Sequence, residues 1–216
     1  ILTPHDTWHD HGNETDEPVI WFDGLDRMLV QHLDAVFSDP HPTGVQELNK
    51  PPNYSVRRYG STRVRPLWQH PPVSPSSSPQ IHYQWADTEK ALRRLAELDE
   101  SGPCDEIIVA YVNPETGGHA LSTLACCTQI LPSGSRTKAQ RHTGSAVCIV
   151  FQGAGASVLD GQRITWERGD VFIIPPWTWY EHANTSASEE AFLFCINDLP
   201  VFQSLGLHQR TEVRRA

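Results

Sequence analysis

Short apolar runs separated by turn residues dominate the second half of the chain. From Asp105 onward, β-branched and other apolar residues gather in six runs that we predict to be strands: 107–111, 121–131, 146–151, 157–159, 171–174 and 191–196. Pairs such as Asp160-Gly161 and Arg168-Gly169 stand between the runs, and pairs of this kind favour tight turns. Many short strands at close spacing indicate an antiparallel sandwich or barrel, so we predict a mainly β fold.

One segment upstream of these runs has helical periodicity instead. Leu92, Leu95 and Leu98 recur at three-residue spacing, and the pattern ends at residues 101–103, which read Ser-Gly-Pro. Asp87 or Thr88 can cap the first turn. We expect a structural helix that packs on a sheet.

Residues 38–80 are the part of the chain least suited to regular structure. They contain nine prolines and the run 76–78 of three serines. Because proline fixes φ and removes a backbone donor, we expect neither helix nor central strand there. The chain is therefore predicted to consist of residues 1–37, a proline-rich linker with one helix at 38–104, and a β domain at 105–216.

Length, charge and cysteine content limit the kinds of protein that this chain can be. The chain has 216 residues, which is one large domain or one and a half small ones. Its 17 basic and 26 acidic residues give a formal charge of -9, so we expect no nucleic-acid and no membrane partner. The five cysteines are odd in number and lack a CxxC spacing, which favours a reduced, cytoplasmic location over a disulfide framework. Cys126 and Cys127 lie in an apolar run and are expected to be buried core.

The N-terminal residues repeat a segment near the C-terminus. When the two segments are aligned, the counterpart of His142 would lie before residue 1. We therefore expect the chain to be a fragment that begins inside the first of two similar domains. The pairs at an offset of 171 residues are Pro4/Pro175, Thr7/Thr178, Trp8/Trp179, His11/His182 and Asn13/Asn184, with His9 opposite Tyr180; at an offset of 172 they are Asp26/Asp198, Gln31/Gln203 and Leu33/Leu205.

Two histidines in the repeat are candidates for chemistry. His9 and His11 alternate along a predicted strand end, so both point to one face while Trp8 and Asp10 point to the other. Two imidazoles on one face can bind a transition metal, or supply one ligand and one acid–base group. They can also be polar groups on a solvated rim, and the pattern alone favours that interpretation.

Six longer motifs are more specific. They are TPHDTWHDHGN (3–13), WFDGLD (21–26), YVNPETGG (111–118), RHT (141–143), WERGD (166–170) and DLPV (198–201). Together they closely resemble the gentisate 1,2-dioxygenases, bicupin enzymes that cleave aromatic rings. The resemblance implies a cupin fold, the double-stranded β-helix or jelly-roll barrel. It makes residues 1–37 the C-terminal end of a first, catalytic cupin and residues 105–216 a second cupin.

The resemblance also implies a reaction and a metal site. His9 matches the third histidine ligand of one Fe(II), while His11 and Asp23 match catalytic positions beside the metal. The implied reaction uses O₂ to open gentisate (2,5-dihydroxybenzoate) to maleylpyruvate in a homo-oligomer, a tetramer in the family. Salicylate or 1-hydroxy-2-naphthoate as substrate, and a non-enzymatic binding protein, are the alternatives. Because the HxH ligand pair would lie upstream, we expect this chain alone to lose Fe(II) and to be inactive.

The second cupin departs from the metal-binding pattern of the family. Gln140 and His142 occupy the HxH positions, Val147 stands near the place of the glutamate, and Tyr180 replaces the third histidine. We therefore expect His142 and His182 to be structural, and this cupin to serve as a scaffold and oligomerisation domain with a degenerate metal site.

Overall fold

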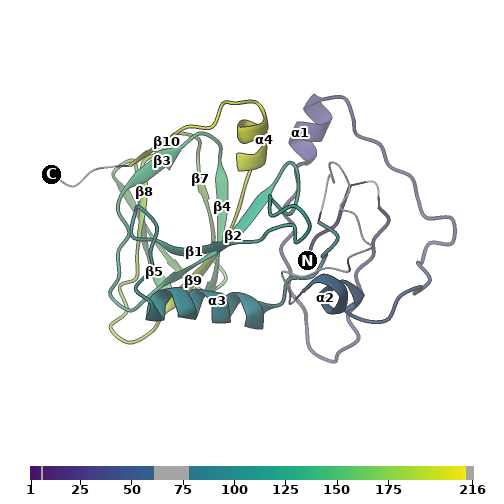
Figure 1. The fold of residues 1–216 in the computed structure, drawn as a ribbon, viewed down its shortest axis with the longest axis horizontal. Helices are drawn as coiled ribbons and strands as arrows, with labels where there is room; N and C mark the ends of the chain where they lie inside the picture. The colour runs from purple at the N-terminus through teal and green to yellow at the C-terminus, as the bar shows by residue number, and fades with distance from the viewer. Residues whose placement is uncertain (6, 61–77, 213–216) are drawn as a thin grey trace.

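Two five-stranded antiparallel sheets form the main body of the protein (Figure 1). The computed structural model describes residues 1–5, 7–60 and 78–212. The strand orders are β1-β2-β9-β4-β7 and β10-β3-β8-β5-β6. The predicted mainly β fold is confirmed. The strands are β1 (Ile107–Ala110), β2 (Ala125–Leu131), β3 (Gln140–His142), β4 (Ala146–Gln152), β5 (Ala154–Leu159), β6 (Gln162–Glu167), β7 (Val171–Ile174), β8 (Tyr180–Ala183), β9 (Ala191–Asn197) and β10 (Arg210–Glu212).

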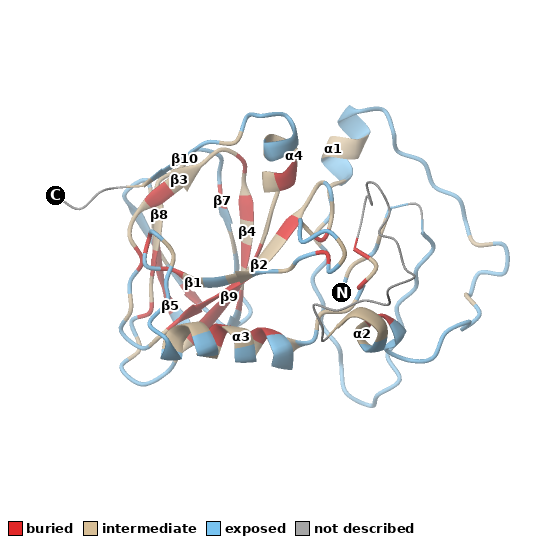
Figure 2. Ribbon diagram, viewed as in Figure 1, coloured by how far each residue is buried: buried red, intermediate tan, exposed pale blue. Residues whose placement is uncertain are grey.

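The core lies between the two sheets, where the buried residues gather (Figure 2). Alternate residues of a strand point to opposite faces, so Ala146, Cys148 and Val150 of β4 are buried together in this core. Leu193 of β9 and Trp166 of β6 complete it from neighbouring strands. The six predicted runs all contain strands. The four strands that the sequence did not predict have polar or mixed sequences and belong to the second sheet.

Helix α3 (Trp85–Glu97) covers the outer face of the first sheet (Figure 1). Leu92 is fully buried against Ile130 and Phe192, and the ring of Trp85 lies 5.1 Å from that of Phe192. This confirms the predicted helix packed on a sheet. The predicted cap was wrong, because the N-cap is Gln84, whose extended backbone lets the helix start early enough to include Trp85, which packs on Phe192.

The described residues before α3 hold only two short helices, α1 (Arg27–His32) and α2 (Tyr54–Tyr59). The strand end predicted around His9 was wrong, since no strand occurs among the described residues of 1–26. The exclusion of helix from residues 38–80 was also wrong at α2, which follows Asn53 in the left-handed conformation. Residues 61–77 of the predicted linker lie outside the described residues, and the domain boundaries stay a prediction.

The internal repeat extends to backbone geometry. Helices α1 and α4 (Leu199–Ser204) correspond residue for residue at the offset of 172, and Asp26 and Asp198 stand at their N-caps. The residue after each C-cap has a positive φ, 53° at Asp34 and 69° at Gly206. Two segments far apart in the sequence thus share one local fold. The matching backbone hydrogen bonds are Leu33 N to Leu29 O (3.0 Å) with Leu205 N to Val201 O (3.2 Å), Asp34 N to Gln31 O (3.0 Å) with Gly206 N to Gln203 O (3.1 Å), and Ala35 N to Val30 O (3.0 Å) with Leu207 N to Phe202 O (2.8 Å).

The same correspondence holds for the side chains that fix these segments. The Asp26 carboxylate accepts a hydrogen bond from Thr123 Oγ1, and the Asp198 carboxylate accepts one from Ser145 Oγ. Upstream, Asn13 Oδ1 accepts from the backbone N–H two residues later at 3.0 Å, as Asn184 Oδ1 does at 2.9 Å. These bonds give the sequence repeat a structural basis.

No helix in the described parts of the chain is both long and apolar enough to span a membrane.

Candidate functional site

His9 and His11 lie on one side of the N-terminal segment. Their ring centroids are 5.4 Å apart, and the ring of His11 stacks on Trp21 at 5.3 Å with an interplanar angle of 26°. Trp8 Nε1 donates to the Asp39 carbonyl at 2.7 Å. The rings of His9 and His11 therefore lie next to each other, although this segment is not a strand. Both histidines are exposed.

Asp23 lies in a different place, a pocket of about 390 Å³ where residues 22–29 meet the barrel. The side chains of Val147 and Asp198 also line this pocket. The two segments lie in contact beside it, because a Cβ on Gly24 would meet Cδ1 of Ile196. A larger residue at this position would require the Ile196 side chain to move. His9 and His11 do not line the pocket, so the structure does not unite all three predicted site residues there.

A complete iron site is not formed by the described residues. Among them, no group of three or more His, Cys, Asp and Glu side chains is placed to hold a metal ion. His9 and His11 offer two imidazoles at most, whereas an iron site of this kind typically has three protein ligands. A complete site therefore needs ligands beyond the described residues.

The structure unites three of the positions that the sequence singled out in the second cupin. Gln140 on β3 pairs with Tyr180 on β8, and the ring of His142 contacts that of Tyr180 at 5.6 Å. Burial raises the pKa of the Tyr180 hydroxyl, which is therefore protonated at neutral pH. Val147 is not part of this group, because it lines the pocket beside Asp23. Its neighbour Cys148 faces the interior instead.

His182 has a structural environment, as its sequence context predicted. It is 4% exposed, and its Nδ1 lies 2.7 Å from Ser157 Oγ. Ser157 Oγ also accepts a hydrogen bond from Trp166 Nε1 at 2.9 Å, so the serine hydroxyl proton is free to bond Nδ1. Burial lowers the pKa of His182 from 6.5 to about 4, and the ring is therefore neutral at pH 7.

This low pKa makes the stability of the barrel depend on pH. Between about pH 6.5 and pH 4 the unfolded chain binds a proton at His182 that the folded chain does not, so the free energy of unfolding falls by up to about 3 kcal/mol as the pH falls. We expect His182→Gln to reduce the dependence of the free energy of unfolding on pH in this range, measured by urea unfolding at several pH values. His32→Gln, at an exposed histidine, is the control and should leave the slope unchanged. Equal slopes for wild type and His182→Gln would contradict the assignment.

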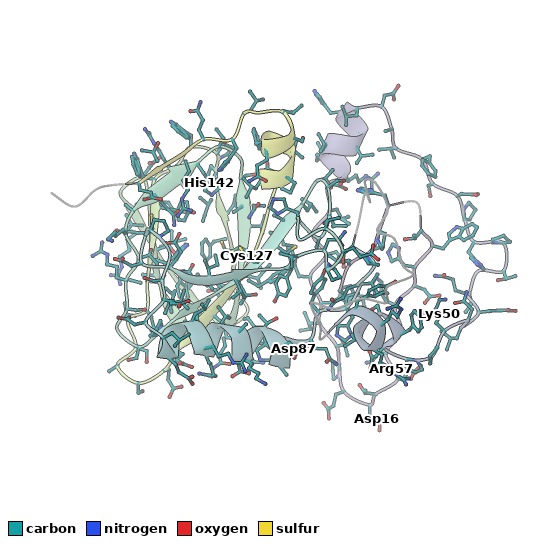
Figure 3. The ribbon with its side chains drawn as sticks, in the orientation of Figure 1. Asp16, Lys50, Arg57, Asp87, Cys127 and His142 are labelled. Carbon is teal, nitrogen blue, oxygen red and sulfur yellow. The ribbon has the colours of Figure 1, made fainter. Side chains whose placement is uncertain are left out.

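Two features of the structure were not predicted from the sequence, the contact of Trp21 and a row of cysteines. Trp21 was part of a motif but received no role, although its stacking on His11 holds that ring in place. A row of three cysteines across β2, β9 and β4 was also missed, because residues far apart in the chain show no common spacing. Cys127 of this row and His142 are labelled in Figure 3.

The chain is similar to known proteins over nearly its whole length. Residues 127–197 match the Cupin domain family Cupin_2, which confirms the cupin fold. The chain is 38% identical over 211 residues to a 5-aminosalicylate 1,2-dioxygenase of Comamonas sp, covering 97% of this chain and 54% of that protein. It is 32% identical to gentisate 1,2 dioxygenase 1 of Aquipseudomonas alcaligenes, with 95% and 58% covered.

The chain is homologous to the gentisate 1,2-dioxygenase family.

Solved structures agree with this relationship. A salicylate 1,2-dioxygenase variant from Pseudoaminobacter salicylatoxidans, in complex with gentisate, superposes with a TM-score of 0.81 and 29% identity. That match covers 94% of this chain and 56% of the other. The chain thus spans about half the length of the two relatives it matches in sequence. By name, these proteins are dioxygenases of 5-aminosalicylate, gentisate and salicylate.

Proposed function

We propose that this chain is part of a ring-cleaving dioxygenase that opens gentisate to maleylpyruvate with O₂. The observation that carries the proposal is the 38% identity to a 5-aminosalicylate 1,2-dioxygenase across 97% of the chain. Gentisate is the specific substrate proposed because the motifs around His9 and Asp23 resemble those of gentisate enzymes. The wider class, hydroxylated aromatic acids, rests on the names of all the relatives described above.

The N-terminal residues supply part of the active site in this proposal. His9 is one of three histidine ligands of Fe(II), and the other two come from residues outside this chain. The bound Fe(II) would supply the coordination positions for substrate and O₂. His11, whose ring stacks on Trp21, would hydrogen-bond the substrate. Asp23 lines a separate pocket among the described residues, so its proposed role of orienting a ligand histidine applies to the site that the upstream residues complete.

The second cupin serves as a scaffold and as an oligomerisation surface, in a tetramer by family resemblance. Its outer face supports this role, because it exposes apolar side chains. Ile173 is 60% exposed, Val171 48% and Phe151 45%. Exposed apolar groups gathered on one sheet favour contact with another protein surface.

An oxygen-consumption assay tests the substrate. The protein for this assay includes the sequence encoded upstream of Ile1, supplied with Fe(II). We expect oxygen uptake with gentisate to be roughly tenfold or more faster than with salicylate, 5-aminosalicylate or 1-hydroxy-2-naphthoate. A site that hydrogen-bonds the 5-hydroxyl of gentisate would keep an unpaired polar group when the substrate lacks or replaces that hydroxyl. Faster uptake with another of these acids would assign that acid instead. The lack of uptake with all four would favour a binding protein.

A further inference from the structure

Three cysteine side chains form a row across the barrel interior. Cys127, Cys195 and Cys148 lie on the adjacent strands β2, β9 and β4, and Cys195 in the middle is the direct cross-strand partner of both others. Cys148 is 0% exposed and Cys195 is 9% exposed, and both belong to the core cluster against which Cys127 packs. All five cysteines of the chain are free thiols.

The closest contact in the row is between Cys148 and Cys195. Their Sγ atoms are 2.7 Å apart. Opposite residues of an antiparallel pair have Cα atoms about 4.5–5.5 Å apart, within the range of about 4.4–6.8 Å that a disulfide requires. The two sulfurs therefore need only a small rotation about their side-chain bonds to reach the bonded distance of about 2.05 Å.

We propose that Cys148 and Cys195 are an oxidation site that forms a reversible disulfide inside the barrel. The oxidant is a small uncharged peroxide such as hydrogen peroxide, because neither thiol is open to a bulky reagent. One thiolate attacks a peroxide oxygen, which gives a sulfenic acid and hydroxide, and hydroxide takes up the thiol proton as water. The second thiol then attacks the sulfenic sulfur, the S–S bond forms, and a second water leaves. Two thiols lose two electrons and the peroxide is reduced to two waters.

The remaining cysteines are placed less well for this reaction. Cys127 Sγ donates to the Cys195 carbonyl at 3.8 Å, so its sulfur is directed at the backbone and not at a second sulfur. Cys104 lies near Arg210, whose Nη2 is 3.7 Å from its Sγ. The described residues contain no group of three placed to hold a metal ion, so the row is not proposed as a metal site. Although the Cys127 thiol acts in the opposite direction, the hydrogen bond with Cys148 and burial raise the pKa of the Cys195 thiol. The thiolate fraction is therefore small, and we expect peroxide to oxidise the pair slowly.

A disulfide at this site would join two neighbouring strands of the first sheet. It would also close a loop that contains β5, β6, β7 and β8 between the two cysteines. Closing such a loop restricts the unfolded chain more than the folded one, so the oxidised protein should melt about 5–10 °C higher than the reduced protein. This inference does not depend on the proposed dioxygenase activity.

The test is peptide mapping of the folded 216-residue chain after treatment with hydrogen peroxide. We expect the number of titratable thiols to fall from five to three. The mass should fall by about 2 Da, one cross-linked peptide should contain Cys148 and Cys195, and dithiothreitol should reverse all three changes. Five remaining thiols, or a disulfide between any other pair, would overturn the proposal.

Matched serine variants separate this pair from its neighbours. Cys127→Ser should retain the cross-link and the rise in melting temperature, whereas Cys148→Ser should lose both. If Cys148→Ser fails to fold, the map of the wild-type chain alone decides. Loss of the cross-link in Cys127→Ser would contradict the assignment, because it would make Cys127 a partner in the disulfide.

Discussion

Replacement of Phe192 by alanine is expected to lower the free energy of unfolding by about 3–5 kcal/mol. Phe192 is fully buried on β9 beneath α3. Its ring meets Trp85 edge to face at 5.1 Å and packs with Leu92. Truncation removes these contacts and leaves a cavity between helix and sheet, which the rigid strands cannot collapse to fill.

Urea unfolding followed by circular dichroism measures this effect. Phe37→Ala is the matched control, because Phe37 is 72% exposed and its truncation should cost less than about 0.5 kcal/mol. A loss in Phe192→Ala no larger than that of the control would show that α3 is not docked on the sheet as described.

The largest functional effect is expected for His9→Ala in the protein that includes the upstream sequence. If His9 is one of three iron ligands, its removal leaves two, and iron affinity should fall by more than about 100-fold, since the loss of an outer-sphere partner alone costs 10–100-fold. Metal analysis after reconstitution with Fe(II) and desalting measures the bound iron.

His32→Ala is the control for this experiment, because His32 is an exposed histidine on α1 with no proposed role. It should retain the iron content of the wild type. Retention of iron by His9→Ala would remove His9 from the proposed ligand set, whatever the activity of the protein.

Hydrophobic patterning predicted the strands of the first sheet and the helix α3 well. In β4 and β9 the apolar residues are dense enough to show as runs, because these strands are buried by the core on one side and partly covered on the other. The polar strands β3, β8 and β10 gave no such signal, since they depend on pairing with distant partners. The start of α3 was misplaced because it depends on the packing of Trp85 against Phe192, and not on the capping propensity of Asp87.

The candidate site was predictable only in part. The repeat could be read from the sequence, and the backbone hydrogen bonds agree with it. The sequence also predicted that His9 and His11 share one face, and their rings lie close together. The segment nevertheless forms no strand, because no neighbouring strand among the described residues pairs with its backbone groups. Stacking of Trp21 on His11 depends on the path of the chain between them, which periodicity does not encode.

The central claim is that this chain holds one part of a dioxygenase active site that other residues must complete. The most direct test is oxygen uptake with gentisate, measured side by side for the 216-residue chain and for the protein that includes the upstream sequence, both supplied with Fe(II). We predict turnover by the longer protein and none by the 216-residue chain. Turnover by the 216-residue chain alone would contradict the claim.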